Sequence, residues 1–170
     1  MPSPFRSPLS LICFGFTAAG GIALDLWVKA VSVDRLQYAF EPYRFIPGWL
    51  EFECVRNHGA VFGLGQGQQV LFLIVSVAAI AFLIFLFATS GRKHGYQILL
   101  GMLLAGVIGN MYDRLRFGYV RDMIHALPRW PHLFPWVFNI ADSLLCVGVG
   151  LMVIHSLLPT HETHRGKDGS

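Results

Sequence analysis

Residues 109–143 carry three polar motifs in a largely apolar chain: Gly109-Asn-Met-Tyr-Asp-Arg114, Gly118-Tyr-Val-Arg-Asp122 and Phe138-Asn-Ile-Ala-Asp142-Ser143. Asp142 lies near the start of a long apolar run, and Asp122 lies just upstream of that run. Carboxylates inside a membrane or at its edge are energetically costly, so they mark functional sites by default. We therefore expect Asp122 and Asp142 to form one catalytic pair.

The composition is typical of an integral membrane protein. Apolar residues make up 54% of the 170 residues, the mean hydropathy is +0.54, and charged residues make up 14%, whereas a soluble domain carries roughly 25% charged residues. The net charge of +3 is small, which argues against a nucleic-acid partner. The three cysteines form no CxxC pair, and the histidines show no metal-ligand spacing, so neither a disulfide framework nor a metal site is expected.

Four apolar runs approach or exceed the roughly 20 residues that cross a membrane. They lie within a single integral membrane domain, 1–170, at residues 9–33, 70–90, 96–112 and 135–158. Only the short segment Gly91-Arg-Lys-His-Gly95 separates the second run from the third, so these two helices must be antiparallel. The polar residues lie at the C-terminal ends of the first and third runs and at the N-terminal end of the fourth. These three ends then share one layer on the side opposite this turn, and both termini lie on the turn side.

The first connection on the far side, residues 34–67, has the two-residue periodicity of β-strands. The alternating apolar positions are Leu36, Tyr38, Phe40, Leu50, Phe52 and Cys54. We expect a small sheet at the membrane edge, where aromatic side chains are favoured. The aromatic candidates for this interface are Tyr38, Tyr43 and Trp49.

The remaining segments complete the predicted fold. Residues 115–134 mix arginines with apolar residues and predict a short interfacial helix that ends near Pro128. Small residues recur every four positions at Gly101, Ala105 and Gly109, a pattern that lets helix backbones approach closely in lipid. The polar tail, residues 160–170, is expected to be disordered.

Charge alone does not decide which side is cytoplasmic. Cytoplasmic loops are usually enriched in lysine and arginine, and the turn side carries Arg6, Arg92, Lys93, Arg165 and Lys167. The far side carries seven arginines but no lysine, and these arginines lie among acidic residues. They can be topology signals or structural partners within a folded element, and composition leaves both interpretations open.

Asp122 and Asp142 could not both remain ionised at close range, so they would share one proton and titrate as a unit. In that state a carboxylate can take a proton from water while the carboxylic acid polarises a carbonyl group, as in aspartic proteases. The alternative is that each aspartate pairs with an arginine, Arg114 or Arg121, or caps a helix. Spacing alone allows either arrangement.

Other polar residues are spaced to support the two aspartates. Asn110 and Asp113 are three residues apart and share a helix face, and Asn139 has the same spacing from Asp142. Asparagine and arginine side chains can hold carboxylates in place by hydrogen bonds. Asp25 and Lys29 are four residues apart, which is the spacing of a helical ion pair.

Five motifs, taken in order, resemble those of the lipoprotein signal peptidases, also called signal peptidase type II. They are Asp25-Leu-Trp-Val-Lys29, Arg56-Asn-His-Gly-Ala-Val-Phe62 and the three motifs of residues 109–143. The resemblance covers nearly the whole chain. Two positions depart from the family's usual pattern: Leu26 stands where glutamine is usual, and Arg121 replaces an apolar residue.

The resemblance implies a mainly α membrane protein, a four-transmembrane-helix bundle with a small extracytoplasmic β-sheet and a short interfacial helix. It implies an aspartic endopeptidase that removes the signal peptide from diacylglyceryl-modified prolipoproteins by cutting just before the lipidated cysteine. The catalytic residues would be Asp122 and Asp142. Supporting or substrate-binding roles would fall to Asp25, Lys29, Asn57, Asn110, Arg114 and Asn139.

The resemblance also implies a multi-pass protein of the bacterial cytoplasmic (inner) membrane, with both termini cytoplasmic and the active site at the periplasmic face. Its partners would be the lipidated prolipoprotein substrate and membrane lipid, with no metal or organic cofactor, and we expect a monomer. The residues themselves leave two other functions open. One is a proton-coupled transporter, which the lack of a visible internal repeat disfavours, and the other is a non-enzymatic lipid-binding protein.

Overall fold

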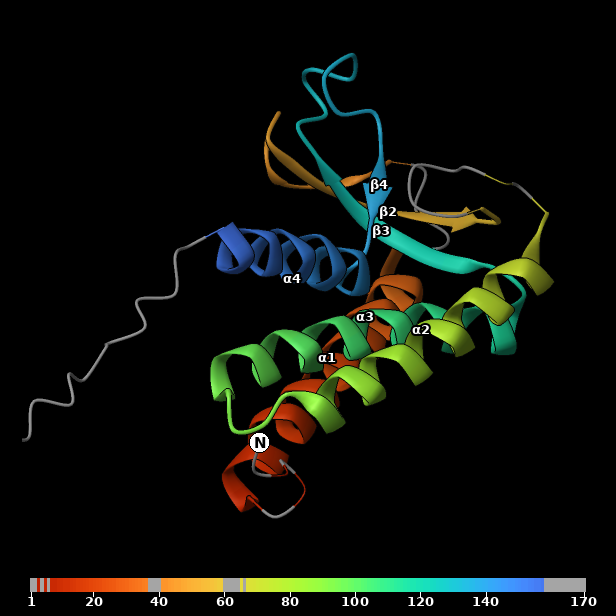
Figure 1. Ribbon diagram of the computed structural model, residues 1–170. Coiled ribbons are helices and arrows are strands. Elements are labelled where there is room, and N and C mark those ends of the chain that lie inside the picture. The colour runs from red at the N-terminus through yellow and green to blue at the C-terminus, as the bar shows by residue number, and fades with distance from the viewer. Residues whose placement is uncertain are drawn as a thin grey trace, which may run out of the picture.

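The computed structural model describes residues 3, 5, 7–36, 41–59, 65 and 67–157, and these contain four helices and four strands (Figure 1). The helices are α1 (Pro8–Leu36), α2 (Gln69–Thr89), α3 (His94–Phe117) and α4 (Ile140–Leu157). The strands are β1 (Tyr43–Ile46), β2 (Leu50–Asn57), β3 (Val120–Ala126) and β4 (Val137–Phe138). Each helix is long and apolar enough to cross a membrane, so the predicted four-helix membrane fold is confirmed.

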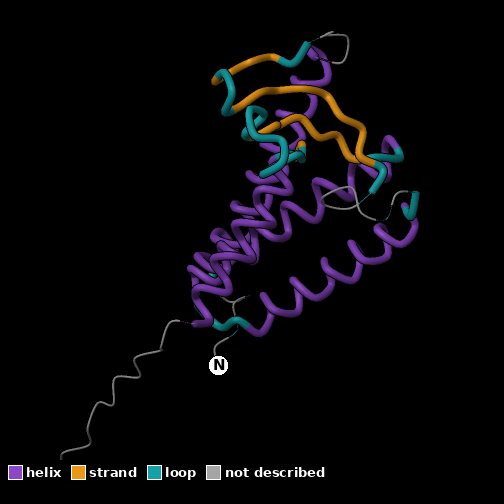
Figure 2. The backbone as a smooth tube through the Cα atoms, turned by 90° about the horizontal axis from the view of Figure 1, so that it is seen from above, coloured by secondary structure: helices purple, strands orange, loops and turns teal. Residues whose placement is uncertain are grey.

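The central helix of the bundle is α3, which packs against α1, α2 and α4. Its residues Leu100, Leu103 and Leu104 are buried together with Ala18 of α1 and Phe87 of α2. Many large apolar side chains on the outer faces of the helices are exposed, as expected for surfaces that contact lipid tails. Figure 2 shows that α2 diverges from the other helices toward the end of the bundle that carries the sheet.

Small residues let α1 approach α3 closely, as their four-residue spacing predicted. A Cβ atom on Gly101 would lie 2.7 Å from the carbonyl oxygen of Phe14 in α1. That contact is with backbone, so a side chain there would force the two helices apart. A Cβ atom on Gly109 would lie 2.5 Å from Asp25 Oδ2. The absence of a side chain at Gly109 therefore makes room for a buried carboxylate as well as for helix packing.

The strands form one antiparallel sheet, in the order β1-β2-β3-β4, across one end of the bundle (Figures 1 and 2). In the β2–β3 pair, Arg56 is opposite Arg121 and Val55 is opposite Asp122. The register shifts between Phe52 and Val55. Two residues of β2 lie there opposite one residue of β3, as in a β-bulge. The predicted small sheet is thus confirmed, although within the described residues its first strand lies later in the sequence than expected.

That first strand is β1, at Tyr43–Ile46, whereas Leu36 is the last residue of α1. The helix continues past the predicted end of the first span, so the periodicity around Leu36 did not mark a strand. Trp49 lies in the turn between β1 and β2 and is exposed, as an interfacial aromatic residue should be. Three further predictions fall on residues outside the described ranges: the strand positions Tyr38 and Phe40, the interfacial role of Tyr38, and the disordered tail 160–170.

The prediction of a short interfacial helix within residues 115–134 is wrong. Instead, α3 continues to Phe117 and ends at Gly118, whose φ of 81° is left-handed and favours glycine. The chain then enters β3, whose first four residues are all buried, so the sequence lacks the alternation that marks a half-buried strand. Pairing with β2 on one side and β4 on the other satisfies the backbone of β3 and stabilises it.

The fourth helix begins at Ile140, not at residue 135, because β4 precedes it. Asn139 caps this helix: its Oδ1 accepts a hydrogen bond of 2.9 Å from the backbone N–H of Asp142. In return, Asp142 Oδ2 accepts one of 3.3 Å from the backbone N–H of Asn139. This reciprocal pair is a capping box, and it fixes the Asp142 carboxyl group at the first turn of α4.

Candidate active site

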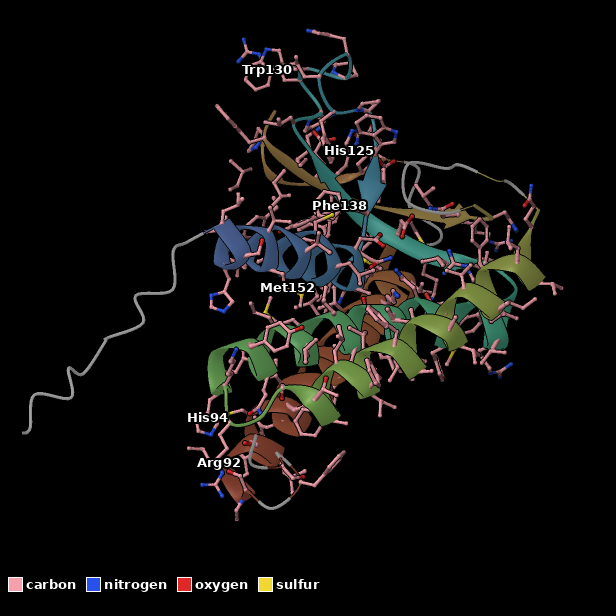
Figure 3. All side chains as sticks on the ribbon, viewed as in Figure 1. Arg92, His94, His125, Trp130, Phe138 and Met152 are labelled. Carbon is pink, nitrogen blue, oxygen red and sulfur yellow. The ribbon has the colours of Figure 1, made fainter. Side chains whose placement is uncertain are left out.

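Buried polar side chains collect where the sheet meets the helix bundle. In Figure 3, His125 and Phe138 lie near this end, whereas Arg92 and His94 lie at the opposite end of the bundle. We call the buried group the polar layer. It comprises Asp25, Lys29, Asn110, Asp113, Arg121, Asp122, Asn139 and Asp142.

Asn139 connects the two predicted catalytic aspartates. Its Nδ2 donates to Asp122 Oδ1 at 2.6 Å, and the capping box joins it to Asp142. Asn57 Nδ2 donates to the other Asp122 oxygen at 2.9 Å, and Asn110 Nδ2 donates to Asp142 Oδ1 at 2.7 Å. The structure therefore brings both aspartates and all three predicted asparagines together, and neutral amides hold each carboxyl group.

Asp122 is only 1% exposed, and this burial raises the pKa of its carboxyl group because the charged form loses its hydration. The negative charge of Asp142 raises the pKa further. Hydrogen bonds from Asn57 and Asn139, and the charge of Lys29, lower it without cancelling the effect of burial, and the pKa is about 7. A carboxyl group with this pKa retains a proton near neutral pH, as the acid of an acid–base pair must.

Lys29 is the central cation of the polar layer and is completely buried. Its Nζ lies 2.7 Å from Asp25 Oδ2 and 3.3 Å from Asp113 Oδ2, and it donates to Asn110 Oδ1 at 3.2 Å. The Asp25–Lys29 ion pair expected from their spacing is thus confirmed. Asp25 Oδ1 also accepts the backbone N–H of Ala141 at 2.8 Å, so a carboxylate on α1 stabilises the N-terminus of α4.

The arginines considered as alternative partners of the aspartates bind elsewhere. Arg121 Nη2 lies 2.7 Å from Asp113 Oδ1, and Arg114 donates to the carbonyl oxygens of Gly59 at 2.9 Å and Asn110 at 3.3 Å. The helix-capping alternative does hold for one of the two aspartates. Asp142 takes part in the cap of α4 and still faces the site. The sequence did not reveal the Asp113–Arg121 pair, because it depends on the turn at Gly118 that brings β3 back to the end of α3.

A cavity of about 170 Å³ reaches the polar layer from the apolar part of the bundle. It lies between α2, α3, α4 and the ends of β2 and β3. Its walls and floor are Phe72, Val75, Ser76, Ala79, Val107 and Leu145, with Asn57, Asn110, Arg114, Val120 and Asp142. An apolar cleft with a few convergent polar groups can bind an apolar chain and orient one bond of it for reaction.

Potential metal ligands are dispersed. In the part of the chain that the structure describes, no three His, Cys, Asp or Glu side chains are grouped so that they could hold a metal ion. His125 instead lies with its Nδ1 2.8 Å from Glu53 Oε1, a contact that joins β3 to β2 within the sheet.

The chain is similar to known proteins over most of its length. Residues 17–158 match the sequence model of the family described as signal peptidase (SPase) II. The chain is 34% identical over 162 residues to the lipoprotein signal peptidase of Enterococcus faecalis, covering 94% of this chain and 97% of the relative. It is 38% identical over 176 residues to the lipoprotein signal peptidase of Rhodopirellula baltica, covering 92% and 76%.

Two solved structures described as bacterial membrane enzymes share the fold. One is 25% identical and superposes with a TM-score of 0.80 over 99% of both chains. The other is 29% identical, with a TM-score of 0.75 over 85% of this chain and 92% of the other. Sequence and fold agree, and this multi-pass bacterial membrane protein belongs to the signal peptidase II family of proteases.

Proposed function

We propose that this chain is a membrane aspartic endopeptidase that removes the signal peptide from diacylglyceryl-modified prolipoproteins, cutting just before the lipidated cysteine. The observation that carries the proposal is the arrangement of Asp122 and Asp142, two buried carboxyl groups joined through Asn139. Membership of the signal peptidase II family supplies the substrate class.

The reaction needs one proton shared by the two aspartates. The ionised carboxylate takes a proton from a water molecule, whose oxygen attacks the scissile carbonyl carbon. The protonated carboxyl group donates a hydrogen bond to the carbonyl oxygen and stabilises the charge that develops there. The C–N bond then breaks, and the leaving nitrogen takes up a proton from the pair. The pKa of about 7 for Asp122 supports a role as the protonated member at neutral pH.

The cavity between α2, α3 and α4 is the proposed binding site for the residues around the cleaved bond. The apolar residues that line it include Val75, Val107 and Leu145, and Asp142 also lines it. A signal peptide and its attached acyl chains are apolar, so they can enter sideways from the lipid where α2 diverges from the bundle (Figure 2). Membrane lipid and the lipidated prolipoprotein are therefore the proposed partners, and we propose that one copy of the chain suffices.

The side chains around the two aspartates have a supporting role in this proposal. Asn57, Asn110 and Asn139 orient the two carboxyl groups through neutral hydrogen bonds. Asp25 joins α1 to the beginning of α4 through the backbone of Ala141. Lys29 joins α1 to the C-terminal part of α3 through Asn110 and Asp113. Arg114 anchors the chain at Gly59 and stacks its guanidinium carbon 5.0 Å from the Phe72 ring centroid. It thereby sets one wall of the cavity. We propose that this site faces the periplasm in the bacterial inner membrane and that both termini are cytoplasmic.

The test is cleavage of a lipidated prolipoprotein by the purified full chain. Asp122→Asn and Asp142→Asn should each reduce kcat by at least about 1,000-fold, because an acid–base pair acts as a unit. The matched control is Asp34→Asn, which changes an exposed acid at the end of α1 and should leave kcat unchanged. Thermal unfolding of each variant shows whether it is folded.

Full activity in either folded dyad variant would contradict the proposed mechanism. Loss of cleavage on addition of a chelator would point to a metal enzyme instead. If the folded wild-type chain releases no signal peptide, the proposed function is wrong. The transporter and the non-enzymatic lipid-binding protein are then the remaining alternatives.

A further inference from the structure

Arg121 directly precedes Asp122 in β3, and the sequence suggested it only as a candidate ion-pair partner of the catalytic aspartates. We propose that Arg121 is a positioning residue: its clamp on Asp113 fixes the beginning of β3 against the end of α3 and so holds the Asp122 carboxyl group facing Asp142. This inference rests on the proposed function, and it concerns how the two aspartates are held in place.

The clamp uses both the backbone and the side chain of Arg121. The backbone N–H donates to Asp113 Oδ2 at 2.9 Å, Nη2 donates to Oδ1 at 2.7 Å, and Nε lies 3.2 and 3.3 Å from the two oxygens. The guanidinium carbon lies 4.4 Å from the centroid of the Phe117 ring. A forked guanidinium–carboxylate pair fixes direction as well as distance, so Arg121 has little freedom to move.

The sheet by itself constrains Asp122 less firmly. Asp122 is opposite Val55, and the register of β2 and β3 shifts immediately beyond that pair, so Asp122 lies beside a bulge. A bulge can redirect the side chains next to it. On the other side, only Gly118 and Tyr119 separate α3 from β3. Arg121 immobilises the chain between this turn and the bulge, and it thereby sets the direction of the next side chain.

The same clamp reaches the second aspartate. Asp113 Oδ2 lies 3.3 Å from Lys29 Nζ, Lys29 donates to Asn110 Oδ1 at 3.2 Å, and Asn110 donates to Asp142 Oδ1 at 2.7 Å. These contacts form a continuous path from Arg121 to Asp142. A displacement of Arg121 would therefore disturb both carboxyl groups, one through the backbone and the other through the polar layer.

Arg121 also balances buried charge. In the ion pairs of the polar layer, the carboxylates of Asp25 and Asp113 are balanced by the cations of Lys29 and Arg121. Without Arg121, Asp25 and Asp113 would share Lys29 as their one cation. Excess negative charge near Asp122 favours the protonated form of its carboxyl group. Loss of Arg121 should therefore move the titration of Asp122 to higher pH. The charged groups that face Asp122 from neighbouring elements are Asp142 of α4, Lys29 of α1 and Arg114 of α3. Arg121 acts on Asp122 indirectly, because it pairs with Asp113, which otherwise draws on Lys29 alone.

The experiment compares Arg121→Gln and Arg121→Lys in the full chain. The matched control is Arg116→Gln, because Arg116 is exposed and its guanidinium carbon lies 5.6 Å from the centroid of the same Phe117 ring. Each protein is tested for thermal unfolding and for kcat and KM on a lipidated prolipoprotein. The Asp122 titration is followed through the infrared band of its protonated carboxyl group, assigned by its loss in Asp122→Asn.

Arg121→Gln should lower kcat by about 10- to 100-fold, the cost of a misplaced catalytic group, with KM within about twofold of wild type. It should also raise the pH midpoint of the Asp122 titration. Arg121→Lys keeps the charge but loses the fork, so its midpoint should stay near wild type while its kcat falls severalfold. Arg116→Gln should change none of these quantities.

Unchanged kcat in folded Arg121→Gln, an effect confined to KM, or an equal loss in Arg116→Gln would overturn the proposal. If Arg121→Gln does not fold, full activity of Arg121→Lys overturns it. The infrared midpoint is read without turnover. A wild-type protein that cleaves no prolipoprotein therefore contradicts the proposed function, whereas an unshifted midpoint in folded Arg121→Gln contradicts the role of Arg121.

Discussion

Asn139 holds two carboxyl groups without fixing their charge. Its Oδ1 accepts the backbone N–H of Asp142, so Nδ2 must be the atom that faces Asp122 and Asn110; the orientation of the amide follows from its partners. A lysine or arginine in this place would keep the neighbouring carboxylate ionised. A neutral amide instead allows the two aspartates to share a proton, which is the condition for one to act as acid and the other as base.

The pH dependence of cleavage follows from the carboxyl group of Asp122. We expect kcat to decline as pH rises through about 7, the pKa of Asp122, because the pair then loses the proton that polarises the carbonyl. The folded state binds this proton more tightly than the unfolded chain does. The stability it contributes is therefore lost as pH rises from the ordinary value of 3.8 through about 7. The measurement is kcat from about pH 5 to about pH 9, with the midpoint assigned to the pair.

The control for this profile is circular dichroism over the same pH range, which separates loss of the proton from loss of the fold. A rate that keeps rising above about pH 8 in folded protein would show that neither aspartate needs to be protonated. In that case Asp122 would be a structural acid rather than a member of a catalytic pair.

Among the elements, α4 carries Asp142, and Gly106 of α3 sets how closely α4 can approach. A Cβ atom on Gly106 would lie 2.6 Å from the carbonyl oxygen of Ala141 and 2.6 Å from Leu145 Cγ. We expect Gly106→Ala to displace the beginning of α4, to cost about 1–3 kcal/mol of stability through overpacking, and to lower kcat by about tenfold or more. Thermal unfolding and kcat of the purified variant check both effects.

Gly150→Ala is the matched control within α4, because a Cβ atom there has nothing within 4 Å. Alanine favours a helix over glycine by roughly 0.5–1 kcal/mol, so this variant should be as stable as wild type or slightly more so. Equal losses in Gly106→Ala and Gly150→Ala would mean that any helical glycine of this protein is needed, and that close approach at Gly106 is not the cause.

The helices were predictable from the sequence because lipid requires long apolar runs. The polar layer was predictable from connectivity, since the short turn at 91–95 fixes which helix ends meet. By contrast, β3 was predicted as a helix, because four consecutive buried residues hide the strand periodicity and the strand depends on distant partners in β2 and β4. Local pattern therefore identified the elements that lipid determines and the alternating strand β2, and it missed β3 and β4, which tertiary pairing determines.

The same division holds within the site. The Asp25–Lys29 pair lies within one helix, and its spacing revealed it. The spacing of Asn139 and Asp142 was also visible, but it was interpreted as a shared helix face, whereas the structure makes it a reciprocal cap at the beginning of α4. The clamp of Arg121 on Asp113 was not, because it forms only after β3 has folded back beside α3. A residue whose partner is supplied by a turn and a strand pairing cannot be assigned a role from its neighbours in sequence.

At the scale of the whole molecule, six of the seven far-side arginines are structural partners. Arg121 binds Asp113, Arg44 lies 3.7 Å from Glu51, and Arg114 binds backbone carbonyl groups. The others stack on rings: Arg56 on Tyr119, Arg116 on Phe117 and Arg129 on Trp130. Arginines engaged within a folded element are weak indicators of orientation, so we give more weight to the basic turn at Arg92 and Lys93 as a topology signal.

We therefore expect Lys93 to be cytoplasmic and Arg44 to be periplasmic, and both side chains are exposed. Lys93→Cys and Arg44→Cys are made separately in a chain whose three native cysteines are replaced by alanine, and intact cells are treated with a maleimide that cannot cross the inner membrane. Arg44→Cys should react once the outer barrier is opened, and Lys93→Cys only after the inner membrane is disrupted. The replaced background must still cleave prolipoprotein, which shows that it has inserted and folded. The reverse labelling would place the two aspartates on the cytoplasmic side and would contradict the proposed periplasmic active site.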